Sequence, residues 1–231
     1  MTRRIDLNAD LGEEITDDAA LLAVVTSANV ACGYHAGTPE TMRRVCEEAA
    51  RRGVAVGAQV SYLDREHFGR RPLDVEPSLL REHVFDQVGQ LCDIAEAAGT
   101  TVSYVKPHGA LYNRVVTDAD QAAAVLAGSG DLPVLGLPGG VLLALATEAG
   151  RAVWREGFPD RGYTSDGRLV PRDQPGALVH DRDEVAANAV RLAESVDSVC
   201  VHGDSVGAVA AAVAVRRTLE DAGWVLEPFG R

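Results

Sequence analysis

Side chains that can move protons stand where the predicted strands end. Asp10 closes the first strand-like segment, a proline separates Lys106 from His108, and Asp204 follows His202 by two positions. Imidazoles and carboxylates act as general acids and bases, and an ammonium group stabilises developing negative charge. We therefore predict that these five residues carry catalysis. Taken singly, each histidine can instead be a hydrogen-bonded structural residue, and Asp204 can cap the last helix.

Further polar residues stand at or near the same strand ends. Because the carboxyl ends of parallel strands meet on one side of an α/β fold, residues from distant parts of the sequence come together there. We predict that this second set binds the substrate: Asn8, Glu13, His35, Tyr62 and Arg161.

Lys106 is unusual in this composition. The chain has 22 basic residues, and reading the sequence shows 21 arginines and this single lysine. A chain that uses arginine for ordinary positive charge keeps a lysine where arginine cannot replace it. Such roles are a compact charge on a phosphate or oxyanion, a base, or a covalent amine. Chance placement is the alternative, and the position at a strand end just before His108 argues against it.

Several established catalytic signatures are absent from the sequence. It contains no GxxxxGK[ST] phosphate loop, no GxGxxG after the first strand, and neither HExxH nor GxSxG. Imidazole and carboxylate groups bind zinc, manganese and iron. The residue types therefore allow a metal site whose ligands are dispersed in the sequence, namely Asp10, His35, His108 and His202. Because their spacing does not show that these groups meet, we assign no metal ligand and no transition metal from the sequence.

A predicted alternation of strands and helices positions these residues. Boundary signals support it: Thr38-Pro39 is typical of a helix start and Gly53 of a helix end. Alternation at this spacing predicts a parallel sheet with right-handed crossovers. The predicted strands are 4–10, 27–32, 54–60, 101–106, 133–137, 152–157 and 198–202, and the predicted helices are 17–25, 39–52, 77–98, 118–127, 141–149, 183–195 and 206–222.

The polarity of the strands favours a barrel over an open sheet. Strands buried on both faces should be continuously apolar. Here Asp6, Asn8 and Asp10 share one face of the first strand, and Tyr104 and Lys106 share one face of the fourth. Polar faces from several strands share one enclosure most simply inside a barrel. We predict an incomplete or distorted seven-stranded (β/α) barrel, formed as a single domain over residues 1–231, with an open doubly wound sheet as the alternative.

Composition argues against several functional classes. The formal net charge is −12 and the isoelectric point is about 4.9, which disfavours binding to nucleic acid or to an anionic membrane surface. The longest apolar run, 206–215, is about half of the roughly 20 residues that span a bilayer. No signal-peptide pattern follows Met1. Because the four cysteines are scattered and form no CxxC pair, we predict reduced thiols in a cytoplasmic protein.

Six segments together resemble the LamB/YcsF family, in the family's order. The match runs from near Ile5 to about Trp224, and the first and fourth segments are the most specific. They are Asp6-Leu-Asn-Ala-Asp-Leu-Gly-Glu13, Ser27-Ala-Asn-Val-Ala-Cys-Gly-Tyr-His-Ala-Gly37, Phe68-Gly-Arg-Arg71, Val105-Lys-Pro-His-Gly-Ala-Leu-Tyr-Asn113, 158–163 and Val201-His-Gly-Asp204. The resemblance implies a distorted seven-stranded barrel of the glycoside hydrolase/deacetylase type, which agrees with the polarity of the strands.

The resemblance also implies an activity. It implies one component of an ATP-dependent enzyme that cleaves the lactam of 5-oxoproline to L-glutamate, with ATP and Mg²⁺ as cofactors and two further subunits, B and C, as partners. On this interpretation Lys106 binds the phosphate or the developing oxyanion, while Asp10 and His108 position water and move its proton. His202 and Asp204 form a second polar pair. The substrate carboxylate or lactam edge would contact Asn8, His35 and Arg161.

The chain departs from the family pattern near the predicted site. Gln59-Val60 stands where members usually have His-Pro, and the loop between Glu13 and Asp17 is shorter than usual. If the usual histidine is a ligand or a base in relatives, the site of this chain is modified. The Gly-, Pro- and Arg-rich segment 158–178 matches the family, and we predict that so long a loop serves as a lid or a subunit contact.

Two other functions stay open. One is a stand-alone metal-dependent amidohydrolase or deacetylase, which predicts a metal near Asp10 and His35. The other is a non-catalytic binding or regulatory subunit that kept the barrel and lost its chemistry at Gln59. Since the sequence has no phosphate loop, ATP can bind either in this chain or on a partner.

Overall fold

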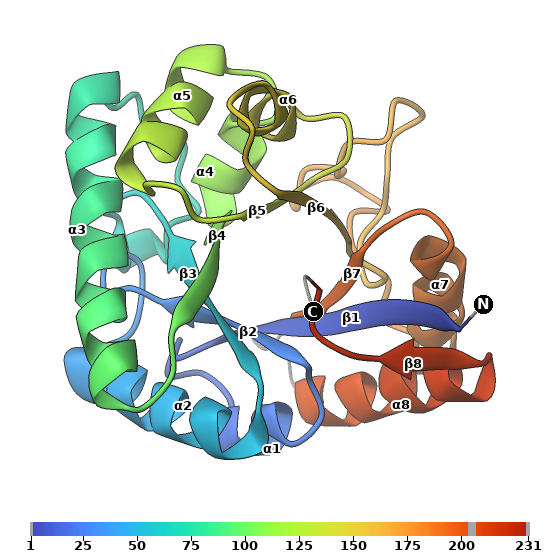
Figure 1. The fold of residues 1–231 in the computed structure, drawn as a ribbon. Helices are drawn as coiled ribbons and strands as arrows, with labels where there is room; N and C mark the ends of the chain where they lie inside the picture. The colour runs from blue at the N-terminus through green and yellow to red at the C-terminus, as the bar shows by residue number, and fades with distance from the viewer. Residues whose placement is uncertain (1, 203–206, 230–231) are drawn as a thin grey trace.

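The first strand closes the barrel. In the computed structural model, which describes residues 2–202 and 207–229, β1 (Arg3–Leu11) pairs in parallel with β2 (Ser27–Ala31) on one side and with β7 (Ser198–Val201) on the other. The seven strands β1 to β7 form the closed ring of Figure 1, which confirms the predicted barrel and rules out the open sheet. The remaining members, in order around the ring, are β3 (Ala55–Val60), β4 (Val102–Pro107), β5 (Val134–Gly136) and β6 (Val153–Gly157).

Helices surround the barrel (Figure 1), and each predicted helix is present with ends shifted by a few residues. The second of them begins at a threonine cap, where the Thr38 hydroxyl accepts a hydrogen bond from the Thr41 amide, and ends at Gly53 with φ 68°. Among the described residues, no helix has the length and apolarity needed to cross a membrane. The helices are α1 (Asp18–Leu22), α2 (Pro39–Arg52), α3 (Pro77–Ala97), α4 (Gly109–Arg114), α5 (Ala119–Gly128), α6 (Val141–Glu148), α7 (Arg182–Ala193) and α8 (Ala208–Asp221).

Three short elements of the described chain add to those predicted. Besides α4, they are a 3₁₀ turn (Arg65–His67) and β8 (Trp224–Leu226), which pairs in parallel with the start of β1 outside the ring. Each is too short to produce a hydrophobic period in the sequence. In the ring, the pairing is shortest between β4 and β5, where Val105 and Val134 form the one register pair, and the register of β3 against β4 shifts between Val56 and Gly57. The barrel is thus closed but distorted.

The two faces of β1 explain why the barrel has a polar interior. Leu7, Ala9 and Leu11 are fully buried in the hydrophobic core outside the ring, whereas the alternate residues point inward. Inside, Asp6 accepts hydrogen bonds of 2.6 Å from the hydroxyls of Thr26 and Ser27, and Ser198 donates to its second oxygen. Burial raises the pKa of Asp6 to about 6. A carboxyl group at this depth is tolerated because hydroxyl groups surround it.

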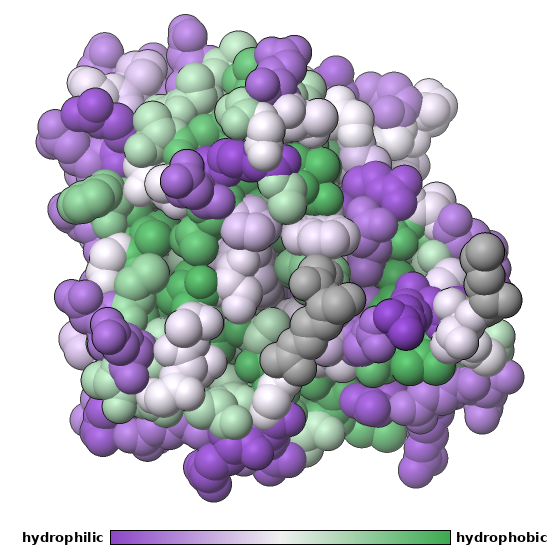
Figure 2. Space-filling model, viewed as in Figure 1, coloured by the Kyte–Doolittle hydropathy of each residue, from purple (hydrophilic) through white to green (hydrophobic). Residues whose placement is uncertain are grey.

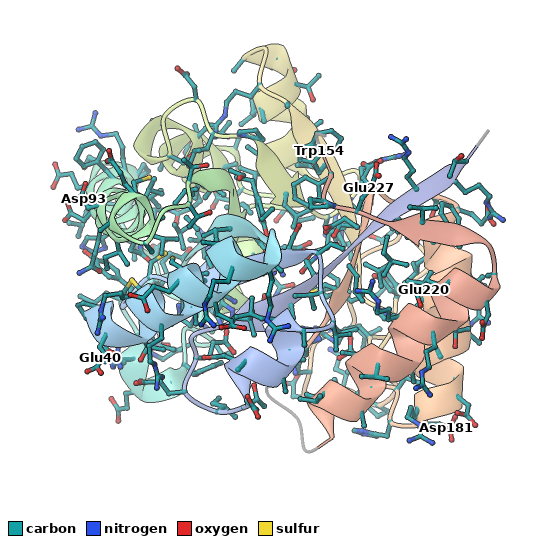
Figure 3. All side chains as sticks on the ribbon, turned by 60° about the horizontal axis from the view of Figure 1, so that its bottom comes forward. Glu40, Asp93, Trp154, Asp181, Glu220 and Glu227 are labelled. Atoms are coloured by element: carbon teal, nitrogen blue, oxygen red, sulfur yellow. The ribbon has the colours of Figure 1, made fainter. Side chains whose placement is uncertain are left out.

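Charged side chains gather on the outer surface of the helices. Figure 2 shows hydrophilic residues around the periphery and hydrophobic residues between them toward the centre of the same face. Glu40, Asp93 and Glu220, labelled in Figure 3, are exposed residues of this acidic outer layer. The Phe229 ring lies 4.8 Å from Tyr104 and 5.2 Å from Trp154, measured between ring centroids. The four cysteines are free thiols.

Gly57 leaves the space that the Tyr104 ring occupies inside the barrel. A Cβ atom at Gly57 would lie 2.2 Å from two ring atoms of Tyr104, whose hydroxyl donates to Asn29 Oδ1 at 2.7 Å. We predict that Gly57→Ala lowers the free energy of unfolding by about 1–3 kcal/mol through overpacking. Denaturant unfolding followed by circular dichroism measures this loss.

Gly89 in α3 provides the matched control, since a Cβ atom there would meet nothing within 4 Å. Gly89→Ala should raise the free energy of unfolding by about 0.5–1 kcal/mol, because alanine is the better helix former. Equal effects of the two substitutions would contradict the steric explanation.

Candidate active site

A cavity of about 570 Å³ opens at the carboxyl ends of the strands. This volume lies within the range of roughly 300–1,000 Å³ that is usual for small-molecule sites. Asp10 at the end of β1 and Lys106 and His108 at the end of β4 line it, together with residues of the loops after β3, β6 and β7. The strand ends therefore bring distant polar residues together, as the sequence predicted.

Lys106 is the buried centre of the site. Its side chain is 2% exposed, and Nζ lies 3.0 Å from Asp10 Oδ1, 2.8 Å from Glu156 Oε1 and 3.3 Å from Cys200 Sγ. Burial alone would lower the pKa of Lys106, but the charges of Asp10 and Glu156 hold it well above its usual value. Lys106 is therefore an ammonium group at neutral pH, which fits a fixed positive charge better than a base.

Asp10 is the carboxylate shared between Lys106 and the histidines. Burial raises its pKa, yet the Lys106 charge, with a contribution from His108, holds that pKa well below the usual value. Asn29 donates to Asp10 Oδ1 at 2.9 Å, and His108 Nδ1 lies 3.8 Å from Oδ2. On its other side, His108 Nε2 lies 3.2 Å from the carbonyl oxygen of Phe68, which favours a proton on that nitrogen.

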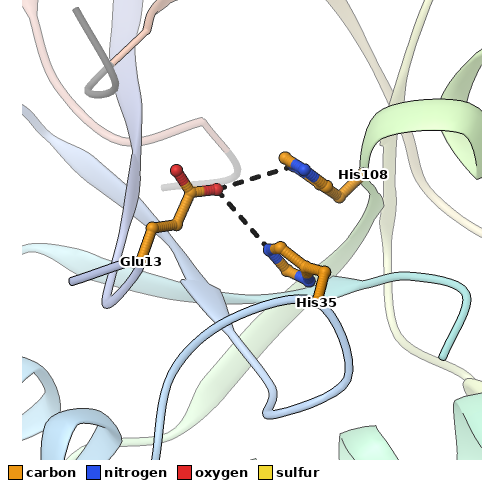
Figure 4. Close-up of side chains that lie close together, drawn as sticks. All are labelled: Glu13, His35 and His108. Carbon is orange, nitrogen blue, oxygen red and sulfur yellow. Dashed lines mark ion pairs between the residues drawn. The ribbon is translucent and has the colours of Figure 1, made fainter. Parts of the chain in front are cut away.

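Glu13, His35 and His108 form a tight buried cluster beside Asp10 (Figure 4). Glu13 Oε1 lies 3.5 Å from His35 Nε2 and 3.6 Å from His108 Nδ1, and the two imidazole rings are stacked with centroids 4.0 Å apart. Gln59 Nε2 donates to Glu13 Oε1 at 3.0 Å and reaches His108 Nδ1 at 2.8 Å. Burial, with a contribution from His108, lowers the pKa of His35 to about 4. His35 is therefore neutral at pH 7, and all three residues offer donor atoms suitable for a metal ion.

His202, just after β7, forms a second polar pair with Asp160 of the loop after β6. His202 Nδ1 and Asp160 Oδ2 are 2.6 Å apart, and the imidazole stacks on Phe158 with centroids 5.4 Å apart. Burial lowers the pKa of His202, but the Asp160 charge outweighs it, so that the pKa is raised overall. The pair places a titratable positive charge in the cavity wall.

Arginines bring further positive charge to the cavity. The lining includes Arg70, Arg161, Arg168 and Arg172, although the chain as a whole is acidic. Arg161 donates to the carbonyl oxygens of Ala177 and Val170, at 3.0 and 2.7 Å, and so holds the long loop after β6 in place. The loop folds back on itself through bridges from Arg161 to Leu178 and from Tyr163 to Leu169. It covers one side of the cavity.

The structure brings together most of the predicted site residues. Those that line the cavity are Asp10, Glu13, Lys106, His108, Arg161 and His202. His35 lies behind Glu13, and Asn8 lies deeper in the barrel, where it donates to the Ser198 hydroxyl at 2.6 Å. Tyr62 points away from the cavity and donates to Gln121 at 2.9 Å. Asp204 lies outside the described residues.

The predicted set lacks three residues that hold the site together: Glu156, Gln59 and Asp160. Glu156 could have been found from its position at the end of the sixth predicted strand. A buried lysine that points into the barrel needs carboxylate partners, and Glu156 is one of them. Gln59 stood out as a departure from the family pattern, but nothing in the sequence showed that its amide reaches both Glu13 and His108. Asp160 stands in a loop, where spacing carries no information about which strand it faces.

Known proteins are similar to this chain over nearly its full length. A protein from Streptomyces griseus subsp. griseus, named as the A subunit of 5-oxoprolinase, is 55% identical, over 97% of this chain and 99% of the relative. The protein of the same name from Mycolicibacterium gilvum is 51% identical, over 97% and 98%. The crystal structure of the lactam utilization protein from Thermus thermophilus superposes with a TM-score of 0.90 at 35% identity, covering 98% of this chain and 100% of that one.

More distant structures share the barrel alone. A family 4 carbohydrate esterase from Streptomyces lividans matches with a TM-score of 0.53 at 14% identity, over 96% of this chain and 91% of that one. This agrees with the predicted deacetylase-type barrel. The family model described as LamB/YcsF family matches residues 5–231. Because this model matches nearly the whole chain and the relatives align over their full length, the chain belongs to the LamB/YcsF family.

Proposed function

We propose that this chain is the A subunit of an ATP-dependent 5-oxoprolinase, which opens the lactam of 5-oxoproline to give L-glutamate. The observation that carries the proposal is the composition of the cavity. It combines a fixed ammonium group, a carboxylate and an imidazole with four arginines, inside a chain of net charge −12. Such a cavity suits a small anionic substrate that acquires a phosphoryl group. The names of the full-length relatives support the same activity.

A lactam resists water because its amide is stabilised by resonance. Transfer of the γ-phosphoryl group of ATP to the lactam oxygen releases ADP and gives an O-phosphorylated ring. Water then adds to the ring carbon, the C–N bond breaks, and the nitrogen takes a proton. The product of this step is an acyl phosphate, and a second water releases phosphate and L-glutamate. ATP, with Mg²⁺, is the cofactor in this proposal.

The residues of the cavity suit three parts of this chemistry. Lys106 is fixed and charged, so we assign it to the transferred phosphate or to the oxyanion that forms when water adds. Asp10 and His108 face the cavity from its floor, and we assign them to positioning water and moving its proton. We assign the arginines and His202 to the negative charge of the substrate carboxylate and phosphate.

We further propose that subunits B and C complete the enzyme, since the relatives are themselves named as one subunit of 5-oxoprolinase. The cytoplasm, where ATP is available, is the compartment that fits the reaction. Since the chain has no phosphate loop, the partner subunits are the better place for the adenosine part of ATP. The cavity of this chain would then receive the lactam oxygen and the phosphoryl group.

The central test is 5-oxoproline-dependent ATP hydrolysis and glutamate release by the chain assembled with its partner subunits. We predict that Lys106→Arg lowers turnover at least about 100-fold, because a wide planar guanidinium cannot replace a compact ammonium between Asp10 and Glu156. Near-normal turnover of the variant would contradict the assignment of Lys106. No activity of the assembled wild-type enzyme would contradict the proposed function itself.

The matched control is Arg43→Lys, an exchange of the same two residue types on the outer surface, where exposed Arg43 pairs with Glu47. It should leave turnover unchanged. Disturbing a buried ion pair is destabilising. Circular dichroism and unfolding curves of both variants therefore show whether a loss of turnover comes from loss of the catalytic group or from unfolding.

His202 gives a second prediction, on pH. Burial and Arg172 lower the pKa of His202, whereas Asp160 and Asp10 raise it, and the net shift is upward. The protonated pair therefore stabilises the fold below the unfolded-state pKa of about 6.5, and this contribution is lost as pH rises through the folded-state pKa. His202→Gln should cost roughly 1–2 kcal/mol more of the free energy of unfolding at about pH 6 than at about pH 9.

Urea unfolding curves at the two pH values measure this difference. His180→Gln serves as control, because His180 is exposed in the same long loop region. A cost of His202→Gln that stays constant with pH, or grows as pH rises, would mean that His202 is not held in its charged form by Asp160.

A further inference from the structure

We propose that Glu13, His35, His108 and Gln59 form a binding site for one divalent transition-metal ion, with zinc as the best match. The four side chains come from the ends of β1 to β4 and meet beside Asp10. The proposal concerns the same cavity as the proposed reaction, but it depends neither on ATP nor on the partner subunits.

The first argument is the spacing of the donor atoms. Ligands about 2.0–2.1 Å from a tetrahedral zinc ion lie roughly 3.3–3.4 Å from one another. Glu13 Oε1 is 3.5 Å from His35 Nε2 and 3.6 Å from His108 Nδ1, and all donor atoms of these three residues lie within 4.8 Å of one another. The Gln59 amide nitrogen lies 3.0 and 2.8 Å from the Glu13 and His108 donors. Small movements of the side chains would therefore suffice to surround an ion.

The second argument is the unmet hydrogen bonding of the same side chains. Within the described residues, neither ring nitrogen of His35 makes a hydrogen bond, although the residue is 1% exposed. The Gln59 carbonyl oxygen Oε1 is also buried without a partner. A half-turn of the Gln59 amide exchanges Oε1 and Nε2, which directs an oxygen ligand at the space between Glu13 and His108. Buried polar atoms without partners are costly, and a metal ion would satisfy both of these groups.

The third argument is charge. With neutral histidines, the buried group formed by Lys106, Asp10, Glu13 and Glu156 carries one formal positive and three negative charges, which sum to −2. A divalent cation would neutralise this total. Binding requires the two stacked rings, now 14° apart in orientation, to turn toward a common point. The His35 ring can turn without breaking a hydrogen bond, since neither of its nitrogens makes one.

A bound ion would supply a Lewis acid beside the lactam carbonyl and lower the pKa of a water molecule. His108 would help to hold the ion, and Asp10, whose Oδ2 lies 3.8 Å from His108 Nδ1, would be the nearby group that accepts a water proton. The inference thus refines the assignment of His108.

The test uses the purified full-length chain, freed of metal with a chelator and then dialysed against Zn²⁺ or Co²⁺. We expect one ion per chain by elemental analysis, and Co²⁺ absorption bands typical of four-coordinate sites. His35→Phe keeps the ring stacking but removes a ligand, so it should weaken binding about 100-fold or more. Gln59→His adds an imidazole ligand and should tighten binding. His180→Phe, on the surface, should change nothing.

Binding of less than one ion per chain, or an affinity that His35→Phe leaves unchanged, would overturn the proposal. Should His35→Phe fail to fold by circular dichroism, Glu13→Gln tests the same site without changing the ring stack, and the same two outcomes apply. Because metal content is measured without substrate or partner subunits, a negative result here leaves the proposed 5-oxoprolinase activity standing. Inactivity of the assembled enzyme likewise leaves the metal site standing.

Discussion

The burial of one ammonium group constrains the rest of the barrel. Removing Lys106 from water is costly unless carboxylates and hydrogen bonds replace the lost hydration. Asp10 from β1 and Glu156 from β6 do so, at 3.0 and 2.8 Å from Nζ, and neither strand is a neighbour of β4 in the ring. In an open sheet, side chains of β1 and β6 would not reach across to a lysine on β4. The closed ring is thus the architecture that makes a buried lysine tolerable here.

The carboxylates in turn require donors, and these form the polar interior. Asn29 donates to both Asn8 and Asp10, and Tyr104 donates to Asn29. The same network continues to Ser198 on β7 through Asn8. Because each group is held by the next, the cavity floor is fixed before any ligand arrives, which is the condition for strong electrostatic catalysis. Asn8 therefore acts below the site, as part of its support.

The sequence predicted the barrel and the strand ends because both follow from local periodicity. The alternation of Asp6, Asn8 and Asp10 with apolar residues indicates an enclosed polar face, and each predicted strand is present within two residues at either end. The partners of these residues could not be predicted in the same way. The Asp160 contact with His202 depends on the path of a long loop. Tyr62 lies beyond the end of β3, where the alternation of the strand no longer sets the direction of a side chain, whereas Tyr104 lies within β4. Side-chain direction beyond a strand end is set by tertiary packing rather than by period.

The pairing of β1 with β7 has a consequence for how the chain folds. The hydrogen bonds from Ser198 to Asp6 and from Asn8 to Ser198 join residues 192 and 190 positions apart. Contacts of such high contact order form late, since the entropy of closing the intervening chain must be overcome first. Until β7 docks, the inward carboxylates of β1 have neither their full set of donors nor an enclosing wall. The binding cavity and the folded state therefore arise in the same cooperative step, and a partly folded chain has no preformed site.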